Sequence, residues 1–244
     1  MDLGLSGRRY VVTAASRGLG YATASALNAD GATTFVVARP SDSLTRAVSD
    51  LGPQATAIGV DMTHPDAAET IAAEIGSDPI DGLLVNGGGP AVGAALEYSD
   101  EQWQQAFELV TLSTLRLLRA LVPRLAPGSS VLIVLSSTVK EPMPTLAASN
   151  VLRPGLAMLV KDLANDLGPR GIRVNGILPG RIATDRLLVL TGSEDAAFSR
   201  DIPLGRLGEP AEFGRVAAFL LSPAASYVSG TLVPVDGGLL RSPW

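Results

Sequence analysis

The chain reads Thr13-Ala14-Ala15-Ser16-Arg17-Gly18-Leu19-Gly20 directly after an apolar, β-branched run and directly before a helical pattern. Glycines in such a turn let backbone N–H groups approach a pyrophosphate, and the N-terminus of the following helix adds partial positive charge. A glycine-rich turn alone is weak support, but a place between the first strand and a helix is the context in which it binds dinucleotides. The stretch therefore predicts a phosphate-binding strand–turn–helix unit, with a tight turn without ligand as the alternative.

Outward from this turn, apolar runs of strand length alternate with longer helical patterns. Strands are predicted at Arg8–Thr13, Thr33–Ala38, Ala55–Val60, Gly82–Asn86, Ser130–Ser136, Arg173–Leu178 and Thr231–Val235. Helices are predicted at Gly20–Ala29, Ser41–Leu51, Asp66–Ile75, Asp100–Leu125, Val151–Leu167 and Pro210–Leu221. Because the strands are largely apolar rather than alternating, both faces of their sheet should be covered. We expect one α/β domain over residues 1–244, a Rossmann-type doubly wound parallel seven-stranded sheet with helices on both faces.

Composition excludes several classes of function. Apolar residues make up 46% of the 244 positions and charged residues 18%, which suits one large core. The net charge of −5, without a cluster of Lys or Arg, argues against nucleic acid or an anionic membrane surface as partner. The absence of cysteine excludes disulfides and thiolate catalysis, and the single His64 cannot build a metal site. No apolar stretch approaches the roughly 20 residues of a membrane span, and no signal peptide precedes the first strand, so a cytoplasmic enzyme is expected.

The end of the second predicted strand indicates which dinucleotide binds. Arg39 stands there, and no acidic residue follows the strand immediately. An Asp or Glu at this place would bind the ribose 2′-hydroxyl of NAD, whereas a cation suits a 2′-phosphate. Arg17, inside the turn, is expected to approach the same phosphate from the other side. The pair favours NADP(H), with two ordinary surface arginines as the alternative.

Several separated motifs carry a family resemblance that covers nearly the whole chain. The first turn resembles T-G-x3-G-x-G with Ala14 in place of the first glycine, and Asn86-Gly87-Gly88-Gly89 resembles N-A-G. Residues 173–184 resemble R-V-N-x-V-x-P-G-x-I-x-T, and the ending fits as well. The chain thus resembles the short-chain dehydrogenase/reductase family, most nearly divergent members of the 3-oxoacyl-carrier-protein reductases whose catalytic tetrad is degenerate.

The resemblance implies a set of cofactor contacts. Asp61 matches the adenine-contacting aspartate, with an ordinary turn-capping role as the alternative, and the Ile182 backbone and Thr184 side chain would hold the nicotinamide carboxamide. The methyl group of Ala14 is expected either to be tolerated or to narrow the turn or shift the cofactor slightly. The residues expected to bind NADP(H) are Thr13, Ala15, Ser16, Arg17, Gly18, Leu19, Gly20, Arg39, Asp61, Met62, Asn86, Gly87, Gly88, Arg153, Pro179, Gly180, Ile182 and Thr184.

The chemistry of the family needs a tyrosine, a lysine four residues later, a serine and an asparagine. The serine is present as Ser137 by register, or as Ser136 if the following loop is one residue shorter. Anchoring on Gly155 puts Ser149 at the tyrosine position and Arg153 at the lysine position, and Thr111 stands where the asparagine should be. A serine hydroxyl has no pKa near neutrality, and an arginine stays protonated, so neither replaces its counterpart as a proton shuttle.

Other titratable groups are candidates for the missing acid. Lys140 and Glu141 follow the serine segment in a loop that borders the active-site cleft in this fold, and a partly desolvated Lys140 near Arg153 would have a lowered pKa. An ordinary solvated loop pair is the alternative for them. Asp185 is a weaker candidate because it also suits a helix cap. The resemblance implies that residues 186–202 form the substrate lid. Its apolar residues, Leu187-Leu188-Val189-Leu190 and Phe198, suggest a partly apolar substrate, with packing on the body of the protein as the alternative.

Three functions remain open on the sequence. The first is an NADP(H)-dependent oxidoreductase that interconverts a carbonyl and a hydroxyl on a small molecule with an atypical proton donor. The second is a non-redox isomerase or lyase on the same fold, and the third is an inactive cofactor-binding subunit. The resemblance also implies a homo-oligomer, a tetramer or dimer, formed through the helices Asp100–Leu125 and Val151–Leu167.

Overall fold

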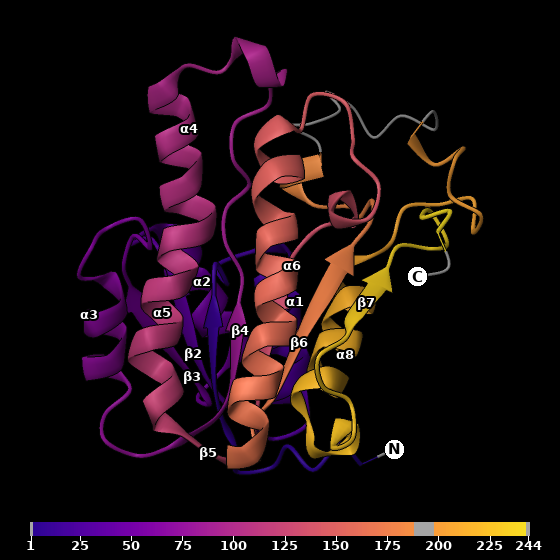
Figure 1. The fold of residues 1–244 in the computed structure, drawn as a ribbon. Coiled ribbons are helices and arrows are strands. Elements are labelled where there is room, and N and C mark those ends of the chain that lie inside the picture. The colour runs from indigo at the N-terminus through magenta and orange to yellow at the C-terminus, as the bar shows by residue number, and fades with distance from the viewer. Residues whose placement is uncertain (1, 188–197, 243–244) are drawn as a thin grey trace.

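The centre of the fold is a parallel sheet in the order β3-β2-β1-β4-β5-β6-β7 (Figure 1). The computed structural model describes residues 2–187 and 198–242. The strands are β1 Arg9–Thr13, β2 Thr33–Ala38, β3 Ala55–Gly59, β4 Ile80–Val85, β5 Leu125–Val134, β6 Arg173–Pro179 and β7 Leu232–Val235. Each neighbouring pair is parallel, so the predicted seven-stranded doubly wound sheet is confirmed.

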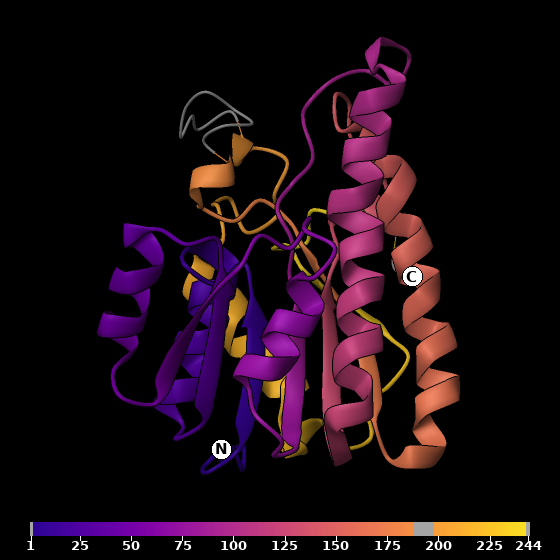
Figure 2. The same cartoon turned by 90° about the vertical axis from the view of Figure 1, so that its left-hand side faces the viewer.

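Helices cover both faces of this sheet. The α-helices are α1 Gly18–Ala29, α2 Asp42–Leu51, α3 Ala67–Glu74, α4 Asp100–Phe107, α5 Ser113–Leu121, α6 Ala147–Leu167 and α8 Pro210–Leu221. Short 3-10 turns are η1 Ala95–Glu97, η3 Val122–Arg124, η4 Ser137–Val139, η5 Gly168–Arg170 and η7 Pro223–Ala225, and η2 Glu108–Leu112 is a π-helical turn. Figure 2 shows α4, η2 and α5 as one long rod beside α6.

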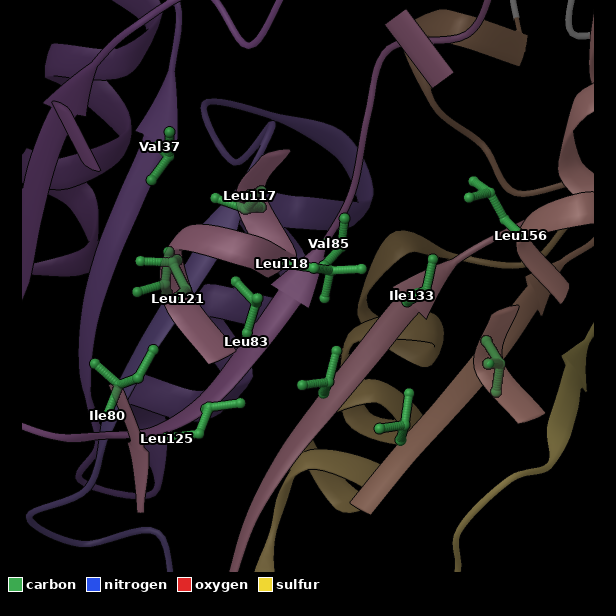
Figure 3. Packing of buried hydrophobic residues seen from close by; sticks show 14 of the residues in the cluster. Val37, Ile80, Leu83, Val85, Leu117, Leu118, Leu121, Leu125, Ile133 and Leu156 are labelled. Atoms are coloured by element: carbon green, nitrogen blue, oxygen red, sulfur yellow. The ribbon is translucent and has the colours of Figure 1, made fainter. Parts of the chain in front are cut away.

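The core has two parts, one on each side of the sheet. Side chains of β4 and β5 pack under α3, α5 and α6 on one side, and Figure 3 shows Leu117 and Leu121 of α5 above Leu83 of β4. On the other side Leu27 of α1 and Phe213 of α8 are fully buried against the sheet. Because both faces are covered, the strands are apolar throughout rather than alternating.

Two helices differ from their predicted form. The predicted helix Asp100–Leu125 is interrupted by the π-helical turn η2 and ends at Leu121, and Leu125 already begins β5. The second helix begins at Ala147, four residues before the predicted Val151, so Pro154 lies in its interior rather than near its start. A proline there leaves a carbonyl of the preceding turn without its helical donor, which local sequence rules disfavour. Packing of the buried Leu156, Ala157 and Val160 against the sheet outweighs that cost.

The strand order reverses between β1 and β4, and a threonine joins the two strands there. Thr13 is fully buried, its Oγ1 donates to the Asn86 carbonyl at 2.7 Å, and it accepts from the Asn86 amide at 2.8 Å. The chain leaves β1 toward β2 on one side and β4 toward β5 on the other, so the carboxyl ends of β1 and β4 diverge. Ligands of open α/β sheets bind at such a crevice. Thr13 thus holds the ends of β1 and β4 together at the base of this crevice.

Candidate active site

A cleft of ≈ 550 Å³ opens above the carboxyl ends of the central strands. It draws on segments from nearly the whole chain, as a doubly wound sheet predicts. Its described lining residues are Ala14, Arg17, Gly18, Leu19, Arg39, Asn86, Gly87, Gly88, Gly89, Val134, Leu135, Ser136, Leu146, Ser149, Arg153, Pro179, Gly180, Ile182, Thr184, Asp185, Arg186 and Leu187. Most of the predicted cofactor residues are therefore brought together, whereas Thr13, Ala15, Ser16, Gly20, Asp61 and Met62 are outside this lining.

The phosphate turn is tight enough to require glycine at its exit. A Cβ on Gly20 would lie 2.5 Å from the Ala14 carbonyl oxygen, so the first turn of α1 can sit directly against the end of β1. This close approach leaves the start of α1 open toward the cleft. A helix N-terminus with free N–H groups and a glycine cradle fits an anionic diphosphate.

Ala14 adopts a backbone conformation that L-residues rarely use. Its φ is 49°, in the left-handed region, and it lines the cleft at the position where the family pattern has glycine. A Cβ in this region costs about 1 kcal/mol. The turn therefore has the left-handed backbone conformation that favours glycine, although alanine occupies the position.

We expect Ala14→Gly to stabilise the protein. The strain of the methyl group is removed, while the extra freedom of the unfolded chain returns part of the gain, for a net rise in unfolding free energy of roughly 0.5 kcal/mol. Urea denaturation measures it. The matched control Ala26→Gly, inside α1, should lower the unfolding free energy by about 1 kcal/mol. An equal fall in unfolding free energy for Ala14→Gly would contradict the claim that Ala14 is strained.

The predicted adenosine end of the cleft carries Arg17 and Arg39, and the carboxylate of Asp61 lies outside the lining. Arg39 is exposed, and its guanidinium forms no hydrogen bond or ion pair with a described residue. Arg17 is paired with Asp185 instead of turning toward Arg39: its Nη1 lies 2.8 Å from Asp185 Oδ2, and both residues line the cleft. Asp61 accepts hydrogen bonds from the Thr63 amide and hydroxyl, which lower the pKa of its carboxyl group. Asp61 thus shows the turn-capping arrangement.

Ser149 and Arg153 form a hydrogen-bonded pair in the cleft. One turn apart on α6, they are joined by a 3.1 Å bond from Arg153 Nε to Ser149 Oγ. Arg153 Nη1 donates to the carbonyls of Val134 and Leu135 at the end of β5, both at 3.0 Å. The guanidinium is therefore fixed on two sides. Ser149, only 8% exposed, lines the cleft, and its own O–H has no acceptor among the described residues.

Burial and a neighbouring cation destabilise the protonated form of the Arg153 guanidinium. Desolvation, together with repulsion from Arg186, lowers the pKa of Arg153 to about 10. It remains protonated at neutral pH and can stabilise a negative charge without delivering a proton of its own. Burial also lowers the pKa of the Arg186 guanidinium.

The segment after β5 separates the two serine candidates. Ser136 lines the cleft, whereas Ser137 begins η4, is 5% exposed and stands outside the lining. Lys140 also stands outside it. Glu141 Oε1 accepts the amides of Arg241 and Ser242, so this side chain fastens the C-terminal segment instead of facing substrate.

Thr111 is predicted to stand at the position of the family's asparagine. Thr111 lies in the π-helical turn η2, and its buried Oγ1 has no hydrogen-bond partner among the described residues. Most of the predicted lid, Leu188-Val189-Leu190 and Thr191-Gly192-Ser193-Glu194-Asp195, lies outside the described residues. Within the described ranges no group of acidic or histidine side chains is placed to hold a metal ion.

Arg186 is the charged residue of the described lining that the sequence did not single out. Its Nη2 donates to the Pro90 carbonyl at 2.6 Å, and its guanidinium occupies the place that a Cβ on Gly89 would need, 2.5 Å from Nε. The run of three glycines after β4 was a usable signal, because the third one has no role in the ribose motif.

Comparisons with known proteins agree with this architecture. Residues 13–240 match the family described as "Enoyl-(Acyl carrier protein) reductase". The chain is 30% identical to a 3-oxoacyl-(acyl-carrier-protein) reductase of Vibrio cholerae, over 97% of this chain and 99% of that protein. The chain belongs to the short-chain dehydrogenase/reductase family.

Two solved structures are similar over almost their whole length. L-sorbose reductase from Gluconobacter frateurii, in complex with NADPH and L-sorbose, has a TM-score of 0.91 and 30% identity, covering 99% of this chain and 100% of that one. A short-chain oxidoreductase from Pseudomonas aeruginosa with bound NADPH, described as containing an atypical catalytic center, has a TM-score of 0.90 and 31% identity, covering 98% and 99%. No helix in residues 2–187 and 198–242 is long and apolar enough to cross a membrane.

Proposed function

We propose that this protein is an NADP(H)-dependent oxidoreductase that interconverts a carbonyl and a hydroxyl group, with Ser149, Ser136 and Arg153 in place of the usual proton-transfer residues. The observation that carries the proposal is the Arg153–Ser149 hydrogen bond inside the cleft, which leaves a serine O–H free beside the predicted nicotinamide site. Both similar structures described above contain NADPH. Arg39 and the start of α1 suit the two phosphate regions of this cofactor.

The cleft fits the cofactor by the chemistry of its lining. Arg39 offers an unpaired cation for the 2′-phosphate, and the Gly18 turn offers backbone N–H groups for the pyrophosphate. Asn86-Gly87-Gly88 and Arg153 suit the nicotinamide ribose, and Pro179, Gly180, Ile182 and Thr184 suit the nicotinamide. When bound, NADPH supplies a hydride to the carbonyl carbon of the substrate.

The chain's own groups stabilise the oxygen on which negative charge develops. Ser149 and Ser136 donate hydrogen bonds to the carbonyl oxygen, and Arg153 stabilises the charge through Ser149 Oγ. The proton that completes the alcohol comes from solvent, because the Ser149 hydroxyl has no pKa near neutrality and Arg153 stays protonated. Because Val134 and Leu135 hold the guanidinium in place, this arrangement exists before substrate arrives.

A turnover assay tests the proposal. Purified protein should oxidise NADPH in the presence of at least one member of a panel of ketones, aldehydes and oxo acids, with one alcohol formed for each NADPH consumed. Product formation that leaves NADPH unconsumed would support an isomerase or lyase instead. No reaction with any member of the panel would support a cofactor-binding subunit.

We further propose that the protein forms a homo-oligomer through α6. Val151 and Met158 on this helix are 59% and 72% exposed, and Phe107 on the adjoining rod is 45% exposed. Exposed apolar side chains on two neighbouring helices are typical of a contact between copies.

Met158→Glu should therefore dissociate the assembly, because it places a charge in that apolar contact. Light scattering should give the mass of a monomer or of a smaller assembly for this variant, and Ser49→Glu on the exposed face of α2 should leave the mass unchanged. A wild-type protein that is monomeric at micromolar concentration would contradict the proposal.

A further inference from the structure

The substrate end of the cleft carries two cations with no described acidic partner. Arg153 and Arg186 both line it, and neither forms an ion pair with a described residue. Asp185 is the only carboxylate among the described lining residues, and Arg17 binds it at 2.8 Å. The phosphates of a bound cofactor can neutralise the cations at the adenosine end. Arg153 and Arg186 lie at the other end of the cleft, where no cofactor phosphate is expected.

Arg186 is held in place, yet part of its guanidinium remains available. Its Nη2 donates to the Pro90 carbonyl, while Nε and Nη1 have no hydrogen-bond partner among the described residues. The glycine at position 89 makes room for this guanidinium beyond the segment predicted to contact the ribose. The side chain is therefore positioned past the ribose, where substrate rather than phosphate is expected.

The two arginines also act on each other. Repulsion from Arg186 is one of the causes that lower the pKa of Arg153, and both guanidinium groups line the same cleft. Two like charges in a partly desolvated cleft destabilise it unless an anion enters between them. A planar carboxylate is the anion that a guanidinium binds best, through two parallel hydrogen bonds.

We propose that the substrate is an oxo acid whose carboxylate is bound by Arg186 while Ser149 and Ser136 bind the carbonyl that is reduced. This inference rests on the proposed oxidoreductase function and adds the substrate class to it. A neutral ketone of the same shape would leave the Arg186 guanidinium desolvated and unpaired, so the site should reject it.

Matched pairs of substrates test the inference. The rates of NADPH oxidation are compared for 2-oxo and 3-oxo acids of about four to six carbons and for their methyl esters, which keep the shape and lose the charge. Wild-type protein should prefer the best acid over its ester by about 10-fold or more in kcat/KM. Arg186→Leu should raise KM for the acid by about 10-fold and leave the values for the ester nearly unchanged. The KM of Arg186→Lys for the acid should lie between the values of wild type and Arg186→Leu.

Binding measurements separate the possible failures. Calorimetry on the NADP+ complex with a saturated, non-reducible carboxylate should show binding that Arg186→Leu weakens and that Arg215→Leu, on the exposed face of α8, does not. Should no acid or ester be reduced while this Arg186-dependent binding persists, the oxidoreductase proposal fails and the carboxylate site stands. Equal turnover of acids and esters would overturn the carboxylate site alone. A weaker NADPH affinity of Arg186→Leu with unchanged carboxylate binding would also overturn it and assign Arg186 to the cofactor.

Discussion

Ser149→Ala should lower kcat for carbonyl reduction by about 10²- to 10³-fold, the usual loss when one preorganised donor to a developing oxyanion is removed. The variant loses the O–H that faces the cleft and cuts the link between Arg153 and the substrate oxygen. Its affinity for NADPH should be unchanged, because the serine is assigned to substrate. Arg153→Met should be at least as slow and should also bind NADPH more weakly, since Arg153 is expected to contact the ribose.

Steady-state kinetics and a fluorescence titration of NADPH measure these effects separately. Ser25→Ala, on the exposed face of α1, is the matched control and should behave as wild type. The dependence of kcat on pH adds a second criterion. Since the pKa of Arg153 is about 10, kcat should be nearly flat around neutrality and fall only as the pH rises toward that value. A Ser149→Ala variant within a few-fold of wild type, with a kcat that titrates near neutral pH, would contradict this site.

Arg39→Ala should weaken NADPH binding by about 10- to 100-fold and leave NADH binding unchanged. A charge-assisted hydrogen bond to a phosphate contributes about 1.5–3 kcal/mol to the binding free energy. Because Arg39 is exposed, its contribution should lie near the lower of these values. Raising the salt concentration should reduce the difference between wild type and variant, because solvent screens this contact. Fluorescence titrations with the two cofactors measure it.

Arg46→Ala provides the matched control for that experiment. Arg46 is exposed on α2, seven residues after Arg39 in the chain and outside the described lining of the cleft, and should have little effect on either cofactor. An equal loss of NADPH and NADH affinity in Arg39→Ala would show that the arginine does not discriminate the 2′-phosphate. Preference for NADH in the wild-type protein would contradict the assignment of NADP(H).

The architecture was predictable because local patterns and the fold agree. The helix Pro210–Leu221 and the strand Thr33–Ala38 are predicted with their observed bounds, and both combine strong apolar patterning with clear turn signals. The start of α6 was predicted too late, at Val151 instead of Ala147, because a proline normally marks the first turn of a helix. The π-helical turn η2 was missed since its pattern is that of an ordinary helix, and only packing shows the interruption.

The site was predictable where it follows a motif and not where it depends on side-chain direction. Arg39, Ser149 and Arg153 were found by register, and the structure brings all three to one cleft. The direction of Arg17, toward Asp185 instead of Arg39, is set by an ion pair between residues far apart in sequence. Arg186 was missed for the same reason, because its place depends on the space left by Gly89.

Transfer of deuterium from the cofactor tests the central claim most directly. NADPH carrying deuterium at both C4 positions is incubated with the protein and a panel of oxo acids, ketones and aldehydes, and the products are analysed by mass spectrometry. The account predicts an alcohol with one deuterium on the former carbonyl carbon, in an amount equal to the NADPH consumed, and its near loss in Ser149→Ala. A product without deuterium, formed while the cofactor remains reduced, would contradict it.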